Sequence, residues 1–149
     1  MLKLYTGITF AAVLWILAWI DVRRRVVPAW GPGLIAALSA VRILSGILAP
    51  SSAAAGFLLM GGTVFLLAVA TGGIGGGDIK LLGACGAFLG LLPGANLLFL
   101  SFFLSGIFSA GLLILPIFVG NAGVPKIREL PFVPFIALAA SLIFFRNPI

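Results

Sequence analysis

Six apolar runs, separated by short polar or glycine-rich segments, follow one another through nearly the whole of this 149-residue chain. A transmembrane helix needs about 20 mostly apolar residues, with a range of about 17 to 25. Charged residues make up 8% of the chain and the mean hydropathy is +1.32, whereas about 25% of a soluble domain is charged. The pattern predicts an all-α integral membrane protein, a bundle of about six transmembrane helices that forms one domain over residues 1–149.

The predicted spans differ in length. The fourth and sixth are short. Local thinning of the bilayer or packing against neighbouring helices can accommodate a short span, and a re-entrant segment is the alternative. The first resembles a secretory signal, but it has no small-x-small cleavage site and is followed by Asp21, so we expect a retained helix. The six spans are Leu4–Ile20, Trp30–Leu48, Ala53–Thr71, Ile79–Leu92, Ala95–Val119 and Phe132–Phe145.

Basic residues predict the orientation of these spans. Arg23–Arg25, Lys80, Lys126 and Arg128 follow the first, third and fifth runs, whereas the connections "APSS" and "LPGAN" have no lysine or arginine. Because cytoplasmic loops are enriched in Lys and Arg, these connections are predicted to be cytoplasmic and both termini to lie outside. The net charge of +6 is then a topology signal, and we expect no nucleic-acid partner. Arg42 lies within the second run and either snorkels to an interface or faces the bundle interior.

The three carboxylates of the chain, Asp21, Asp78 and Glu129, all fall at predicted cytoplasmic helix ends. Ionisable residues at such positions are costly and are functional-site candidates. Glu129 has Lys126 and Arg128 beside it, which favours an interfacial ion pair over catalysis. Asp21 and Asp78 are therefore the candidates for chemistry.

The residues that the chain lacks restrict that chemistry. It has no histidine, so neither a Ser-His hydrolase nor an HExxH zinc protease is possible, and with Cys85 as its one cysteine we expect no metal or cofactor. Cys85 is predicted to be a packing residue. Two adjacent aspartates can hydrolyse an amide without a metal, because proximity keeps one protonated while the other is ionised and activates water.

Glycines form the segment "GGIGGGD" that leads to Asp78. Their backbone would allow close approach of an extended substrate strand, although a flexible turn between two helices is an equal alternative. Small residues four apart, such as Gly86 and Gly90, predict close packing of helices.

Three motifs resemble one family. "GGGDIKLLGACGAFLG" at Gly75–Gly90 resembles the G-x-G-D-x-K-L signature of type IV prepilin leader peptidases, which are GxGD aspartic intramembrane proteases. "DVRRRVVP" at Asp21–Pro28 is similar to the first-aspartate motif of that family. "ELPFVPFIALAA" at Glu129–Ala140 resembles the opening of its sixth helix, with Val133 where glycine is common. The motifs occur in the family's order and cover nearly the whole chain.

The resemblance implies that Asp21 and Asp78 are the catalytic pair. It implies a loop and substrate-binding residues around the second aspartate, namely Gly75, Gly76, Gly77 and Lys80. The implied substrates are type IV (Flp-like) prepilins or pseudopilins, whose short basic leader precedes an apolar helix and is cut at the cytoplasmic face of the bacterial inner membrane. Larger members carry two Cys-x-x-Cys pairs linked to N-methylation. This chain lacks them and resembles the short Tad/Cpa-type form, so no methyltransferase activity is expected.

Two other classes stay open from the residues alone. A small proton-coupled transporter would use both aspartates as a relay near the bilayer midplane, and a non-catalytic pilus or secretion assembly subunit would use small-residue faces to bind partner helices. For the peptidase, Lys80 and Arg23–Arg25 are hypothesised to create an electropositive field that receives an acidic residue of the substrate. For the arginines, a role in topology alone is the alternative.

Overall fold

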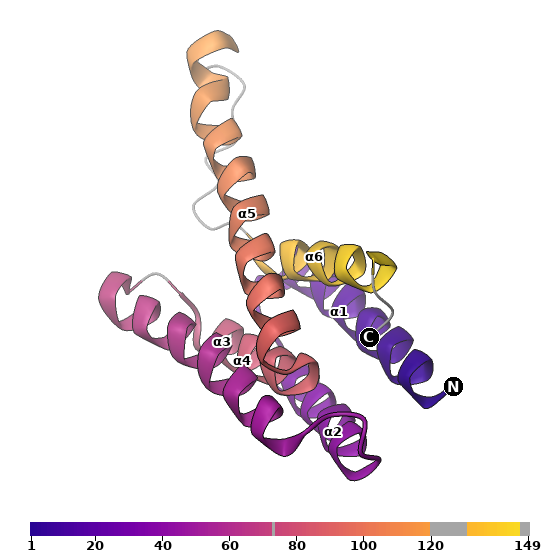
Figure 1. Cartoon of the computed structure of the whole chain (residues 1–149). Helices are drawn as coiled ribbons and strands as arrows, with labels where there is room; N and C mark the ends of the chain where they lie inside the picture. Colours follow the sequence, from indigo (N-terminus) through magenta and orange to yellow (C-terminus); the bar gives the residue numbers. More distant parts are fainter. Residues whose placement is uncertain (73, 120–130, 147–149) are drawn as a thin grey trace.

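All regular elements in the part of the chain that the structure describes are α-helices. The structure is a computed structural model and describes residues 1–72, 74–119 and 131–146 (Figure 1). The helices are α1 (Leu2–Arg24), α2 (Trp30–Leu44), α3 (Pro50–Thr71), α4 (Gly76–Leu89), α5 (Leu91–Val119) and α6 (Val133–Arg146). This confirms the predicted all-α membrane protein with six helices. The assignment of one domain stays a prediction.

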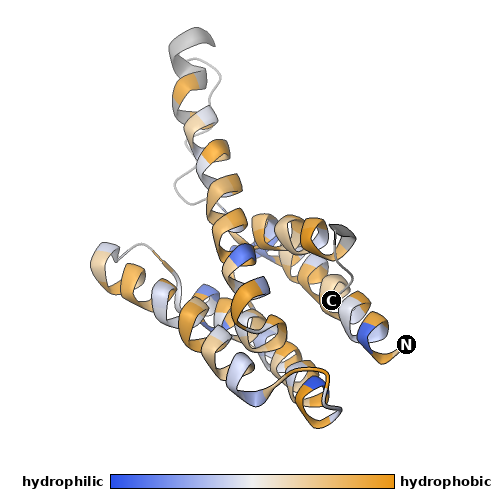
Figure 2. Cartoon of the chain, viewed as in Figure 1, coloured by the Kyte–Doolittle hydropathy of each residue, from blue (hydrophilic) through white to orange (hydrophobic). Residues whose placement is uncertain are grey.

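Three of these helices are long and apolar enough to cross a membrane, namely α1, α3 and the segment Leu91–Leu112 of α5. At 22 or 23 residues each they extend about 33–35 Å, which exceeds the roughly 30 Å hydrocarbon core. Helices α2, α4 and α6 have 15, 14 and 14 residues and extend only about 21–23 Å. Most residues along the described helices are hydrophobic (Figure 2). The protein is thus a helical membrane protein that combines three full-length helices with three shorter ones.

Two predicted helix boundaries were wrong. Helix α2 ends at Leu44, four residues before the end of the apolar run, because Gly46 turns the chain with a φ of 70°. The segment "LPGAN", expected to be a connection, lies inside α5, which begins at Leu91 directly after Gly90. Pro93 is tolerated there because the first turn of a helix does not need its N–H group. A single residue, Gly90 with a φ of 83°, therefore joins α4 to α5.

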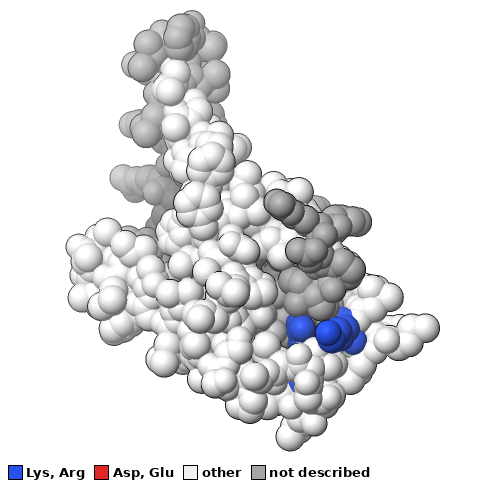
Figure 3. Space-filling model, in the orientation of Figure 1, with Lys and Arg blue, Asp and Glu red and all other residues white. Residues whose placement is uncertain are grey.

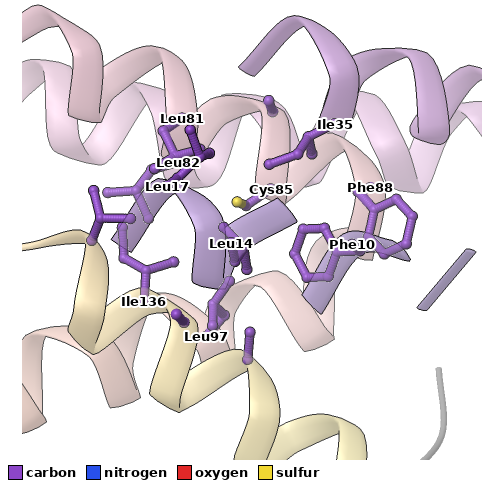
Figure 4. Close-up of a cluster of buried hydrophobic side chains, with 14 of the residues drawn as sticks. Phe10, Leu14, Leu17, Ile35, Leu81, Leu82, Cys85, Phe88, Leu97 and Ile136 are labelled. Atoms are coloured by element: carbon purple, nitrogen blue, oxygen red, sulfur yellow. The ribbon is translucent and has the colours of Figure 1, made fainter. Parts of the chain in front are cut away.

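Helix α4 lies at the centre of the bundle. It packs against α2, α3 and α5, and eight of its 14 residues are buried. Side chains of α1 reach it as well, since the Phe10 ring stacks on the Phe88 ring with centroids 4.3 Å apart. Figure 4 shows the resulting core, in which residues of α1, α2, α4, α5 and α6 meet. The core includes Leu14, Leu17, Ile35, Leu81, Leu82, Cys85, Leu97 and Ile136. The central position of α4 fixes both of its ends relative to the neighbouring helices.

The close contact between α3 and α4 depends on glycine. A Cβ atom on Gly56 would overlap the carbonyl oxygen of Gly86, and a Cβ atom on Gly86 would overlap the backbone of Gly56. One turn further along, a Cβ atom on Gly61 would lie 3.2 Å from the Cα atom of Gly83. The close approach predicted at Gly86 is confirmed, and a methyl group at this crossing would separate the two helices.

Two unusual buried residues lie in the bundle interior. Arg42 is 4% exposed, and its Cζ atom lies 4.5 Å from the centroid of the Phe88 ring. Of the two alternatives for Arg42, the structure therefore supports the interior one. Its Nε and Nη1 atoms are buried and have no hydrogen-bond partner among the described residues. Cys85 is fully buried, as expected for a packing residue. On the face drawn in Figure 3, charged side chains are confined to one small area.

Candidate active site

Asp21 lies in the last turn of α1, and the chain turns immediately after it. The N–H group of Arg25 donates to the carbonyl oxygen of Asp21 at 2.8 Å, and Arg25 has a left-handed φ of 53°, which ends the helix. The Asp21 side chain is buried, with 6% of its surface exposed. A carboxylate at this position is thus enclosed by protein although it stands at the end of a membrane helix.

A backbone group of α6 faces the Asp21 carboxylate. The N–H group of Val133, the first residue of α6, donates to Oδ2 of Asp21 at 3.1 Å. The first N–H groups of a helix have no partner within it and carry partial positive charge, so a carboxylate there is stabilised. The third motif of the sequence therefore meets the first, with Val133 as the residue that joins them. From the sequence, Val133 is only a departure from the glycine that is common at this position, and the contact with Asp21 is not predicted. The donor is a backbone N–H group, so the residue type gives no signal of the contact.

The antiparallel packing of α1 and α6 explains why these groups meet. Near the middle of α1, the Trp15 Nε1 atom donates to the Ser141 hydroxyl at 3.1 Å. As α1 advances from Trp15 to Asp21, the facing position on α6 moves back from Ser141 to Val133. The register of this helix pair thus sets the partner of Asp21.

Asp78 lies in the first turn of α4, before the apolar run that begins at Ile79 and so outside the membrane-spanning part of the chain. It is half-buried, and burial is the main cause that raises the pKa of Asp78 from 3.8 to about 6, with the charge of Asp21 as the second cause. The two carboxylates are thus close enough to interact electrostatically, which no feature of the sequence alone could establish. Two carboxylates that interact in this way can hold one proton between them.

The glycines before Asp78 differ from the predicted loop. Gly75 caps the helix, whereas Gly76 and Gly77 belong to the first turn of α4. A Cβ atom on Gly77 would lie 3.0 Å from Cβ of Val27, in the connection between α1 and α2. The glycine segment therefore lets the start of α4 pack directly against the connection that follows Asp21.

The basic residues have separate positions. Arg23 lies over the Trp19 ring, with Cζ 4.4 Å from its centroid, and Arg24 and Arg25 are exposed. Lys80 is exposed, and its charge is not among the causes that shift the pKa of Asp78. Two residues along a helix correspond to a rotation of about 200°, so Lys80 faces away from the side of α4 that carries Asp78.

Within residues 1–72, 74–119 and 131–146, no group of three or more His, Cys, Asp or Glu side chains is placed to hold a metal ion. Glu129, with Lys126 and Arg128, lies outside the described residues. Two carboxylates, one buried and one with a raised pKa, are what the site offers for chemistry. Such a pair is suited to general acid and base catalysis.

Comparison with known proteins identifies the family of this chain. The chain belongs to the type IV leader peptidase family, which matches residues 8–110 and so includes both aspartates. The chain is also 30% identical over 148 residues to a prepilin leader peptidase/N-methyltransferase of Bacillus subtilis (strain 168). That alignment covers 96% of this chain but 56% of the relative, so the chain spans little more than half of its length. No solved structure matches the chain.

Proposed function

We propose that this chain is an aspartic endopeptidase that removes the leader of prepilins or pseudopilins, with Asp21 and Asp78 as its catalytic pair. The observation that carries the proposal is the position of the two aspartates at one end of the bundle, where the Val133 N–H group donates to Asp21 and the charge of Asp21 contributes to raising the pKa of Asp78 to about 6. Membership of a peptidase family supports the reaction class. The printed name of the Bacillus subtilis relative supports prepilin as the substrate class.

In the proposed mechanism the two aspartates share one proton. Asp21, which accepts the Val133 N–H group, is ionised and takes a proton from water as the water oxygen attacks the scissile carbonyl carbon. Asp78, whose raised pKa favours the protonated form, donates to the carbonyl oxygen. The tetrahedral intermediate then collapses: one of its hydroxyl groups returns a proton to Asp78 as the C=O bond re-forms, the C–N bond breaks, and the leaving nitrogen receives the proton held by Asp21. No covalent intermediate forms.

The proposed location follows from charge. Since Arg23–Arg25 and Lys80 lie at the aspartate end of the bundle, this end is proposed to face the cytoplasm and both termini to lie outside, in the bacterial inner membrane. A position at helix ends suits hydrolysis, which needs water, better than a transporter relay at the midplane. The substrate is proposed to carry a short basic leader before an apolar helix. Because the 149 residues contain one cysteine and no Cys-x-x-Cys pair, N-methylation is not part of the proposal.

The test uses the full chain in lipid nanodiscs and a synthetic substrate with a basic leader followed by an apolar helix, with cleavage measured by mass spectrometry. We expect cleavage by the parent chain and none by Asp21→Asn or Asp78→Asn. Glu129→Gln is the matched control, since it removes the third carboxylate and should keep activity. Asn can still accept the Val133 N–H bond, so thermal unfolding of Asp21→Asn should stay close to that of the parent. Substantial turnover by either aspartate variant would refute the two-aspartate mechanism.

A further inference from the structure

Helices α2, α3 and α4 enclose an apolar groove of about 480 Å³ that begins next to the aspartate end of α4. On α4 the lining consists of Ile79 and three residues at spacings of four and three, Lys80, Ala84 and Ala87, and this spacing places those three on one face of the helix. Five of the eleven residues that line the groove are alanine or glycine, and one is a lysine: Ala36, Gly61, Gly62, Ala84, Ala87 and Lys80. The groove is thus bordered by three helices and can receive side chains of an element that packs along α4.

The shape of the groove suits a helix. In a bilayer, apolar side chains gain nothing by leaving lipid for another apolar surface, so helices associate where small residues let backbones come close. A Cβ atom on Gly62 would meet no atom within 4 Å, so the groove is open there. Phe57 and Phe65, which also line it, are 50% and 55% exposed and can pack against an occupant.

Lys80 gives the groove a charge. On one side of α4, Asp78 is within reach of the charge of Asp21. Lys80 lies on the opposite side of this helix and lines the groove. An ammonium group at the border of an apolar groove favours an occupant with a carboxylate at the same depth, because an acidic side chain in lipid is otherwise costly. Charge complementarity therefore favours one kind of occupant for the groove. This occupant is an apolar helix with an acidic residue at the end that lies nearest the aspartates of the site.

We infer that the groove binds the apolar helix of the peptidase's substrate and that Lys80 selects substrates with a carboxylate on the adjoining part of this helix. The inference rests on the proposed function and specifies where its substrate docks. It keeps the acidic partner expected for Lys80 from the sequence but places it in the groove, on the side of α4 away from the aspartates.

The start of α4 provides a path from the groove to the aspartates. Gly75 and Gly76 are exposed, and a Cβ atom on Gly76 would meet no atom within 4 Å. An unwound segment of the substrate can therefore cross this end of α4 without meeting side chains. It must unwind there in any case, because the peptide bonds of a helix are internally hydrogen-bonded.

The position of the helix is tested by disulfide crosslinking in the Asp78→Asn background, which separates binding from cleavage. Gly62→Cys places a thiol in the groove, and Gly106→Cys is the matched control, since Gly106 is an exposed glycine on α5 with no atom within 4 Å of its Cβ position. The native Cys85 is fully buried. The probe is the synthetic substrate with cysteines scanned along its apolar helix, in nanodiscs. We expect crosslinks to Gly62→Cys at helical spacing and none to Gly106→Cys.

The role of Lys80 is tested by kinetics with two substrates that differ by a Glu or a Gln in the first turns of the helix. For the parent chain we expect kcat/KM to favour Glu by about 2- to 5-fold, a modest ratio because Lys80 is exposed. In Lys80→Met the ratio should fall to about one, and in Lys80→Glu a substrate with Lys should become the better one.

The outcomes separate the two proposals. If the parent chain cleaves but Gly62→Cys forms no crosslink with the substrate, the groove is not the docking site and the proposed function stands. Disulfide-linked dimers of Gly62→Cys would assign the groove to a second copy of the chain and would also overturn the inference. An unchanged Glu-to-Gln ratio in Lys80→Met would remove Lys80 from recognition. Absence of cleavage by the parent chain refutes the proposed function instead.

Discussion

Gly77→Ala should damage the site without unfolding the protein. A Cβ atom on Gly77 would lie 3.0 Å from Cβ of Val27, 3.5 Å from its carbonyl oxygen and 3.6 Å from its Cγ2. The optimal separation of two carbon atoms is about 3.5–4.0 Å, so the start of α4 and the connection after α1 must move apart by about 0.5–1 Å. This connection follows Asp21, and the start of α4 carries Asp78, so the shift falls on the distance between the two carboxylates.

The size of the effect follows from this overlap. Overpacking by one methyl group costs about 1–3 kcal/mol. If this whole cost raises the activation free energy of cleavage, the rate falls by about 5- to 150-fold. A misplacement of about 1 Å costs about 100-fold. We therefore expect kcat/KM to fall by about 10- to 100-fold. Stability should change by less than about 2 kcal/mol, because alanine is favoured over glycine in a helix by about 1 kcal/mol.

Gly76→Ala is the matched control. It makes the same chemical change one residue earlier in the same helical turn, but its Cβ atom would meet no atom within 4 Å. A single methyl group at Gly76 should lower kcat/KM by no more than about 3-fold, because only a bulkier side chain would obstruct the proposed substrate path, and thermal stability should rise by about 0.5–1 kcal/mol. Both variants are compared in nanodiscs by cleavage kinetics and by thermal unfolding. If Gly77→Ala cleaves as fast as Gly76→Ala, the contact with Val27 does not position the aspartates.

Three other predictions concern the proton of the site and the packing of α4. Burial and, to a smaller extent, the charge of Asp21 raise the pKa of Asp78 to about 6. The value of kcat/KM should therefore fall as pH rises through about 6, because Asp78 loses the proton that it donates. A pH profile that stays flat up to about pH 8 would contradict this. Asp21→Asn should lower the pKa of Asp78, measured by infrared titration of its carboxyl group, although burial should keep it above 3.8; an unchanged pKa would mean that the carboxylates do not interact. Gly86→Ala should destabilise the protein by about 1–3 kcal/mol in thermal unfolding, because its methyl group would overlap the backbone of Gly56. Unchanged stability would show that α3 and α4 can move apart at this crossing without cost.

The fold was largely predictable because hydropathy and charge act locally. The apolar runs predicted the number of helices, and the sequence placed both aspartates at the same end of the bundle. The errors occurred where a backbone conformation decided the boundary. Gly46 ends α2 early through its positive φ, and the apolar run around it gives no sign of this. Likewise Pro93 suggested a connection, but at the start of a helix it is tolerated.

The contacts of the site could not be predicted in the same way because they are tertiary. The bond from the Val133 N–H group to Asp21 depends on the register of α6 against α1, and 112 positions separate the two residues. The sequence does not decide whether Arg42 reaches the membrane interface or faces the bundle interior. Its environment depends on Phe88, which lies in a helix far along the chain. Motif order suggests that the aspartates act together, but only the packing of α4 against its neighbours brings Asp78 within reach of the charge of Asp21.

The run of three glycines shows how one composition can conceal three different roles. As a sequence it predicted a flexible loop that approaches the substrate. In the structure Gly75 caps α4, Gly76 leaves the end of the helix open, and Gly77 allows contact with Val27. Only Gly77 needs to be small for the start of α4 to pack against Val27, whereas the need for a small residue at Gly76 depends on whether substrate passes over it. A bulky residue at Gly76 that blocks cleavage but leaves the pKa of Asp78 unchanged would therefore locate the substrate path independently of the catalytic pair.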